Sequence, residues 1–178
     1  MSPAKSLSAG ILLYRHPSDS FEVLLAHPGG PFYVNKDLGS WVIPKGECAE
    51  GESAEAAARR EFAEEVGFPA PEQLISLGKA HQRAGKYVSC FAAPFSESDE
   101  WIAEHFSPGS FRLEWPPSSG RIEQFPEVDR ISFFPRDEAL RKILPSQLVW
   151  LDRLEELLRQ GKRASLLATH RMNFGGRL

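Results

Sequence analysis

The sequence has little of several features that would indicate other classes of protein. Its 178 residues include only two cysteines, Cys48 and Cys90, which are too few for a disulfide framework and lack the spacing of a zinc site. No apolar run approaches the roughly 20 residues that cross a bilayer. The apolar stretch at residues 9–14 is too short for the core of a signal peptide. We therefore expect a cytoplasmic protein that does not bind or span a membrane.

The charge balance excludes a further class of protein. Lysine and arginine number 21 against 24 aspartate and glutamate residues, and the formal net charge is -3. There is thus no positive field to gather a long polyanion, and bulk nucleic-acid binding is not expected. What is present, 42% hydrophobic and 25% charged residues, is typical of a globular protein with one core. We expect one domain over residues 1–160 and leave the tail from residue 161 to 178 unassigned.

The spacing of apolar, glycine and proline residues predicts two hairpins, two further short strands and three helices. The strands are expected at 7–15, 21–27, 74–82, 87–94, 111–115 and 131–134. The helices are expected at 53–66, 136–143 and 146–159, the last with leucines at helical spacing that should pack on the sheet. The polar loop at 28–39 is long enough to be functional.

Three glutamates on the expected helix at 53–66 form the most informative pattern. The run REFAEEVGF occupies residues 60–68, so Glu61 and Glu65 lie one turn apart and Glu64 lies on the adjoining row. Like charges at this spacing destabilise the helix by roughly a few tenths of a kcal/mol per pair, which favours a compensating cation. Oxygen ligands without a nearby Cys or His pair indicate Mg²⁺, for which Mn²⁺ could substitute.

The wider segment resembles a known family. Gly46, Glu52 and the run at 60–68 match the Nudix box at every fixed position. Over roughly residues 7–159 the chain is similar to Nudix (MutT-like) hydrolases, and the segments 27–31, 114–121 and 125–130 resemble a bacterial subgroup of predicted nucleoside-triphosphate pyrophosphohydrolases. The resemblance implies the α+β Nudix fold, a mixed β-sheet sandwiched between α-helices.

The same resemblance implies roles for the box residues. Glu61, Glu64 and Glu65 would bind the metal ion, and one of the three would also activate the attacking water; which one is left open. A backbone carbonyl at Lys45 or Gly46 would complete the metal shell. The supporting residues would be Glu52 and Arg60, which hold loop and helix together, and Gly46 and Gly67, which meet backbone demands at a tight loop and at the C-terminal cap of the helix.

A further ligand often comes from a loop after the box in this family. Glu123 and Glu127 are the candidates here, and we favour Glu127, although an exposed loop acid is an equally good interpretation. Ahead of the box, the Pro-Lys-Gly at 44–46 is similar to members that act on dinucleoside polyphosphates or inositol pyrophosphates, whereas many members that act on nucleoside triphosphates carry Pro-Gly-Gly.

Residues outside the box are weaker candidates for substrate binding. Lys45 would place a mobile ammonium beside the diphosphate. Arg83 and Lys86 could add phosphate contacts, and Tyr33 and Trp115 could stack on a base. For each there is a simpler interpretation, since most loop lysines and arginines are solvated surface charges and most aromatic side chains pack.

The expected function is Mg²⁺-dependent hydrolysis of a diphosphate linkage by a metal-activated water. The substrate is expected to be a nucleoside diphosphate derivative, that is, a nucleoside triphosphate or a dinucleoside polyphosphate. The partner is a small nucleotide or another diphosphate, and the oligomeric state stays open. A Nudix-fold sensor that binds nucleotide without cutting it is one alternative, although all box carboxylates are present. An isomerase of a prenyl diphosphate is another; it would need a catalytic cysteine, for which Cys90 is available.

Overall fold

The computed structural model describes residues 6–16, 20–82 and 85–174, with side chains up to Lys162. Its main element is a six-stranded mixed sheet in the order β4-β5-β1-β2-β8, with β3 paired to β1 as well. β1 pairs in parallel with β5, and the other pairs are antiparallel. The strands are β1 (Leu7–Arg15), β2 (Glu22–Pro28), β3 (Lys45–Glu47), β4 (Ile75–His81), β5 (Tyr87–Pro94) and β8 (Val128–Pro135).

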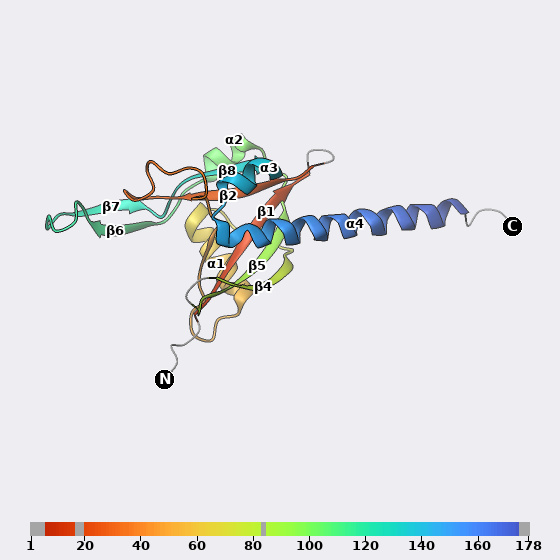
Figure 1. Cartoon of the computed structure of the whole chain (residues 1–178), viewed down its shortest axis with the longest axis horizontal. Helices are drawn as coiled ribbons and strands as arrows, with labels where there is room; N and C mark the ends of the chain where they lie inside the picture. Colours follow the sequence, from red (N-terminus) through yellow and green to blue (C-terminus); the bar gives the residue numbers. More distant parts are fainter. Residues whose placement is uncertain (1–5, 17–19, 83–84, 175–178) are drawn as a thin grey trace.

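Helices cover both faces of this sheet, as Figure 1 shows. Successive side chains of a strand point to opposite faces, and the fully buried residues of β1 divide accordingly. Ile11 and Leu13 pack with α1 (Ala54–Val66) and α2 (Asp99–His105). Leu12, on the opposite face, packs with α3 (Arg136–Lys142) and α4 (Leu148–Phe174). The expected α+β Nudix fold, a mixed sheet between helices, is confirmed.

α1 forms where the sequence predicts a helix. The side chain of Ser53 caps its first turn by accepting a hydrogen bond from the Ala56 amide at 3.1 Å. Gly67 ends it in the left-handed region at a φ of 92°, which glycine adopts without steric cost. Phe62 and Val66 are fully buried against the sheet, so the helix packs on β1 through its apolar face, while Glu61 and Glu65 approach β3.

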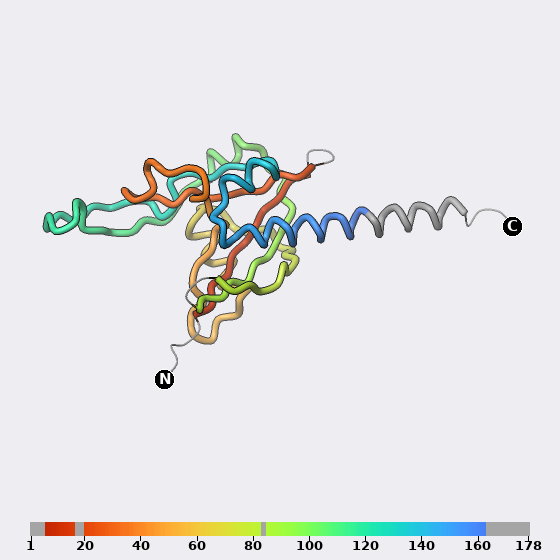
Figure 2. The backbone as a smooth tube through the Cα atoms, viewed as in Figure 1, coloured from red at the N-terminus to blue at the C-terminus, as the bar shows by residue number. Residues whose placement is uncertain are grey.

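A two-stranded arm extends from the body. It consists of β6 (Ser110–Glu114) and β7 (Ile122–Pro126), and it protrudes beyond the sheet in Figures 1 and 2. The turn beyond β2 lies against its base, because the Gly29 amide donates to the Glu127 carbonyl at 2.9 Å. β7 and α2 were not expected from the sequence, because both are short and carry several charged or polar residues.

The remaining differences concern the ends of elements. Both hairpins and the helix that packs its leucines on the sheet are confirmed, but α4 continues to Phe174 through much of the segment left unassigned above. It follows directly on a short 3-10 turn, η2 (Pro145–Gln147). No helix of the described residues is long and apolar enough to cross a membrane.

Candidate functional site

The candidate site lies where β3 runs beside α1. β3 pairs with the start of β1, placing Gly46 opposite Ala9 and Lys45 opposite Gly10. The carboxylate of Glu61 lies directly against Gly46, and a Cβ atom at this position would overlap it. The tight loop predicted at Gly46 is wrong, because the residue lies in a strand and is not among the glycines with positive φ. Glycine is needed because the backbone and the Glu61 carboxylate approach so closely.

Glu65 lies one helical turn further on, facing the same strand. Its Oε2 atom accepts a hydrogen bond from the Lys45 amide at 2.9 Å. The pKa of Glu65 is raised to about 8, chiefly by burial and further by the nearby carboxylates of Glu61 and Glu127, while the amide and ammonium of Lys45 oppose this shift. Three acidic side chains and Lys45 are thus brought within electrostatic range of one another.

Glu127 reaches this place through the backbone at the base of the arm. The Gly109 amide donates to the Glu64 carbonyl at 2.8 Å, and the Glu127 amide donates to the Gly109 carbonyl at 2.9 Å. A Cβ atom on Gly109 would lie 3.0 Å from Glu127 Oε2 and 3.3 Å from the Glu64 carbonyl oxygen. The Glu127 carboxylate therefore lies beside the second half of α1. Gly109 was missed from the sequence, where it is one glycine in a polar loop.

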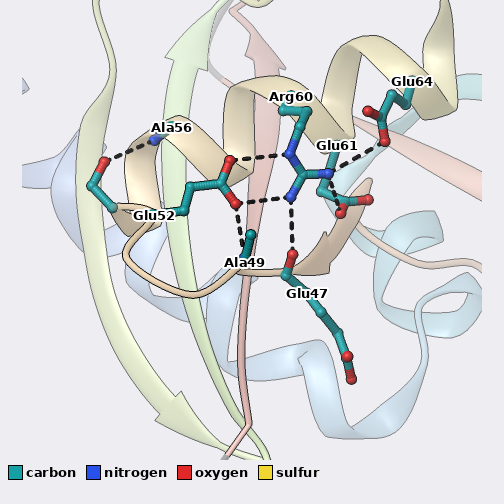
Figure 3. A network of polar contacts seen from close by, with 8 residues as sticks. Glu47, Ala49, Glu52, Ala56, Arg60, Glu61 and Glu64 are labelled. Atoms are coloured by element: carbon teal, nitrogen blue, oxygen red, sulfur yellow. Dashed lines mark hydrogen bonds and ion pairs between the residues drawn. The ribbon is translucent and has the colours of Figure 1, made fainter.

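Arg60 connects the loop before α1 to the helix, as Figure 3 shows. Its guanidinium binds both carboxylate oxygens of Glu52, at 3.0 and 2.9 Å, and donates to the Glu47 carbonyl at 3.0 Å. It also donates to Glu61 at 2.7 Å and more weakly to Glu64 at 3.4 Å. The planar contact of Arg60 with both carboxylate oxygens of Glu52 is the strongest geometry for an ion pair.

The partner of Arg60 is anchored from a second direction. Glu52 also accepts a hydrogen bond from the Ala49 amide at 2.9 Å, which closes the loop on itself. The hydrogen bonds from Arg60 and then from Ala49 lower the pKa of Glu52 to about 2. The same contacts raise the pKa of the Arg60 guanidinium. The pair of Glu52 and Arg60 thus holds the loop before α1 to the helix.

Most of the atoms at the candidate site that could bind a metal ion are oxygen atoms, which fits Mg²⁺ or Mn²⁺ better than zinc. They are the carboxylates of Glu61, Glu64, Glu65 and Glu127 together with the β3 backbone. The space that the missing Cβ of Gly46 leaves for Glu61 fits such a site too. Within the described residues, however, no three His, Cys, Asp or Glu side chains converge on one point that could hold a metal ion. Arg60 engages Glu61 and Glu64 instead.

The weaker substrate candidates lie further out. The Lys86 ammonium pairs with Glu47 at 3.4 Å on the surface at the edge of the site. The ring of Tyr33 lies under the Lys36 ammonium at 4.9 Å. Trp115 lies at the far end of β6 and makes an edge contact with Phe32, their ring centroids 5.3 Å apart. Arg83 lies outside the described residues.

A histidine and an aspartate that sequence reasoning missed fix the loop at 28–39. His27 is fully buried in β2, and its Nδ1 atom lies 2.7 Å from Asp129 Oδ1 in β8. Its Nε2 atom lies 2.8 Å from the Lys36 carbonyl oxygen, for which it is the donor. The only sequence signal was a histidine inside an apolar strand, which does not reveal its partners.

Neither cysteine has the lowered thiol pKa of a reactive cysteine. Cys90 is buried on the face of the sheet that α4 covers, whereas the carboxylates lie on the side of α1, and burial raises the pKa of its thiol. Burial, with a contribution from Glu52, raises the pKa of the Cys48 thiol too. Reactive cysteines have lowered pKa values, so the isomerase alternative finds no support in Cys90.

Comparison with known proteins settles the family. A family model described as NUDIX domain matches residues 5–154. The chain belongs to the Nudix family. No curated protein matches the sequence, but many solved structures share the fold.

Three of these structures illustrate the likeness. A mutT/nudix family protein from Listeria innocua has a TM-score of 0.59 at 20% identity, over 89% of this chain and 97% of that one. The C. elegans Ap4A hydrolase in a binary complex has a TM-score of 0.58 at 20% identity, over 87% and 98%. The NUDIX domain of Shewanella oneidensis NrtR, complexed with ADP ribose, has the same score and identity, over 87% and 89%. At this identity the likeness shows the fold alone.

Proposed function

We propose that this Nudix protein is a divalent-cation-dependent hydrolase that cleaves the diphosphate linkage of a nucleoside diphosphate derivative, either a nucleoside triphosphate or a dinucleoside polyphosphate. The observation that carries the proposal is the setting of Glu65. It is partly buried against the Lys45 amide, and Glu61 and Glu127 raise its pKa further. Carboxylates gathered in this way are stabilised by a bound cation.

Each acidic residue then has a task. Glu61, Glu64 and Glu65 would hold Mg²⁺ together with the Lys45 carbonyl, and Glu127 would add a carboxylate from the base of the arm. When bound, the cation neutralises phosphate oxygens and lowers the pKa of a water molecule. One of the three helix glutamates would take the proton of that water, and the Lys45 ammonium would pair with the diphosphate.

The supporting residues hold these groups in place. Arg60 binds Glu52 with two hydrogen bonds and Glu61 with one, so the loop and the helix keep a fixed distance. Gly46 gives the Glu61 carboxylate room beside the backbone. Known relatives of the fold are consistent with a nucleotide substrate: one is an Ap4A hydrolase and another was crystallised with ADP ribose.

The test is a panel of dinucleoside polyphosphates, nucleotide sugars and nucleoside triphosphates, incubated with Mg²⁺ and assayed for released phosphorylated products. We expect at least one substrate to turn over, and Glu65→Gln to lower kcat by roughly 100-fold or more. Glu104→Gln, which changes an exposed glutamate on α2, should leave kcat unchanged. Far-ultraviolet circular dichroism checks that each variant folds.

Two results would count against the proposal. Tight nucleotide binding without turnover across the panel would favour the sensor. Full activity in Glu65→Gln would show that this carboxylate is not part of the metal site.

A further inference from the structure

The end of β2 and the start of β8 are joined irregularly beside the candidate site. Between His27 and Pro28 the register with β8 shifts by one residue, which leaves Asp129 as the extra residue of β8. Such a β-bulge changes the direction in which the side chains beyond it point. Because side chains alternate between the two faces of a strand, a bulge at Asp129 decides on which side the Glu127 carboxylate lies.

His27 holds the extra residue in place. Its ring is fully buried, and its Nδ1 atom lies 2.7 Å from Asp129 Oδ1. The Asp129 side chain is itself only 30% exposed, and Arg130 Nε lies 3.3 Å from the same oxygen atom. A hydrogen bond to a carboxylate is stronger than one between neutral groups. The contact from His27 therefore fixes the bulge at Asp129.

Two glycines let the turn after His27 lie against the base of the arm. The Gly29 amide donates to the Glu127 carbonyl at 2.9 Å, and a Cβ atom on Gly29 would overlap the carbonyl oxygen of Pro126. Gly30 has a φ of 87°, and a Cβ atom there would lie 2.9 Å from the Phe111 Cζ atom. The backbone of Glu127 is thus held beside the turn by a contact that larger residues would prevent.

The carboxylate placed in this way belongs to the candidate site. A Cβ atom on Gly109 would lie 3.0 Å from Glu127 Oε2 and 3.3 Å from the Glu64 carbonyl oxygen. Glu127 also contributes to the raised pKa of Glu65. Glu123, the other candidate for the downstream ligand, lies four residues further out along β7, which is roughly 13 Å of extended chain. Its place along the arm and the bulge together bring Glu127 beside α1.

We propose that His27 is a positioning residue for Glu127. By fixing Asp129 in the bulge, it turns the Glu127 carboxylate toward α1, where this carboxylate joins the helix glutamates around a divalent cation. The inference rests on the proposed function, and it gives a physical role to the segments 27–31 and 125–130, which lie outside the box. The second ring nitrogen of His27 binds the Lys36 carbonyl at 2.8 Å and fixes the loop at 28–39 instead. The two contacts can therefore be separated by mutation.

Two replacements of His27 make this separation. The side-chain nitrogen of asparagine can take the place of Nδ1, and that of glutamine the place of Nε2. The full chain is titrated calorimetrically with Mn²⁺ alone, which shares oxygen ligands with Mg²⁺. We expect His27→Gln to weaken Mn²⁺ binding by about tenfold and His27→Asn by less than about threefold, since residues that orient a metal ligand contribute roughly ten- to a hundredfold. His81→Gln, which changes an exposed histidine on β4, is the matched control.

A double-mutant cycle shows whether His27 acts through Glu127. If it does, His27→Gln combined with Glu127→Gln should weaken Mn²⁺ binding no more than Glu127→Gln alone. Asp129→Ala removes the same contact from its more exposed side and should behave like His27→Gln in both backgrounds. It carries the test if His27→Gln fails to fold, which circular dichroism checks. Losses that simply add, or unchanged Mn²⁺ binding in Asp129→Ala, would overturn the positioning role.

Binding of Mn²⁺ without substrate also separates this inference from hydrolysis. Losses of Mn²⁺ affinity that do not add, without turnover in the substrate panel, support the positioning role and overturn hydrolysis. Turnover that Glu65→Gln abolishes, with Mn²⁺ binding that neither Glu127→Gln nor His27→Gln changes, does the reverse. Absence of Mn²⁺ binding by the unmodified chain would overturn both.

Discussion

Glu52 and Glu65 belong to the same motif, yet their surroundings act on them in opposite directions. Glu52 is held by the Arg60 guanidinium and the Ala49 amide, which lower its pKa to about 2. Glu65 is partly buried and faces further carboxylates, and its pKa rises to about 8. A carboxylate that stabilises a fold already has its cation. One that lies among other acids needs a cation from outside, and this difference separates the supporting Glu52 from the candidate metal ligand Glu65.

Gly46→Ala should have the largest effect on activity of the variants that leave every charge in place. The new Cβ atom would overlap the Glu61 carboxylate, which must then move away from β3. We expect kcat to fall roughly 100-fold, since a displacement of about 1 Å can have that effect. Steady-state kinetics on the substrate found in the panel would measure it. Gly161→Ala on α4, where a Cβ atom meets nothing within 4 Å, is the control. Equal activity in both variants would contradict the close approach of Glu61 to the strand.

Mg²⁺ should distinguish the two glutamates through thermal stability. A cation that binds only the folded chain raises the melting temperature. We expect saturating Mg²⁺ to raise the Tm of the unmodified protein by a few degrees, on the order of 2–4 °C per kcal/mol of binding energy. Glu65→Gln should lose this increase, because a ligand has gone. Glu52→Gln should keep most of it, although its Tm without metal should be lower. The same increase in Glu65→Gln would place the cation elsewhere; differential scanning calorimetry makes the measurement.

Acid titration should show that Glu52 stabilises the fold through its charge. Because the folded pKa of Glu52, about 2, lies below the ordinary glutamate value of 4.5, its contribution to stability is fully present above pH 4.5. It is lost as the pH falls through 2. Glu52→Gln should therefore unfold at lower urea concentration than the unmodified protein at pH 7, and the gap should shrink from pH 4.5 downwards. Glu104→Gln should show no such gap. A gap that stayed constant to pH 2 would show that the loss is not electrostatic.

The sequence predicted the parts of the fold that depend on local pattern. The apolar run of β1 and the cap residue Gly67 lie next to the structure they specify, and their elements formed as expected. β7 did not follow from its sequence, since it is a strand only through its pairing with β6.

The residues of the candidate site likewise fall into those placed by local spacing and those placed by contacts between distant segments. Helical spacing placed Glu61, Glu64 and Glu65 on neighbouring positions of α1, because positions three and four apart share a face. The positions of Glu127 and Gly109 depend on hydrogen bonds between segments about 20 to 45 residues apart, from Glu64 to Gly109 and from Gly109 to Glu127. No local pattern can predict such contacts.

The arm provides the smallest expected effect. Six residues of extended chain separate Trp115 from Gly109, which is roughly 20 Å at 3.3 Å per residue, and Gly109 is the point where the arm meets α1. The Trp115 ring already packs against Phe32. We therefore expect Trp115→Ala to change KM by less than about threefold, whereas Lys45→Ala, which removes a charge close to Glu65, should raise KM by about tenfold. A larger effect of Trp115→Ala than of Lys45→Ala would mean that the substrate reaches along the arm. That result would favour a long dinucleoside polyphosphate over a nucleoside triphosphate, because only the longer molecule could span from the carboxylates to the tip.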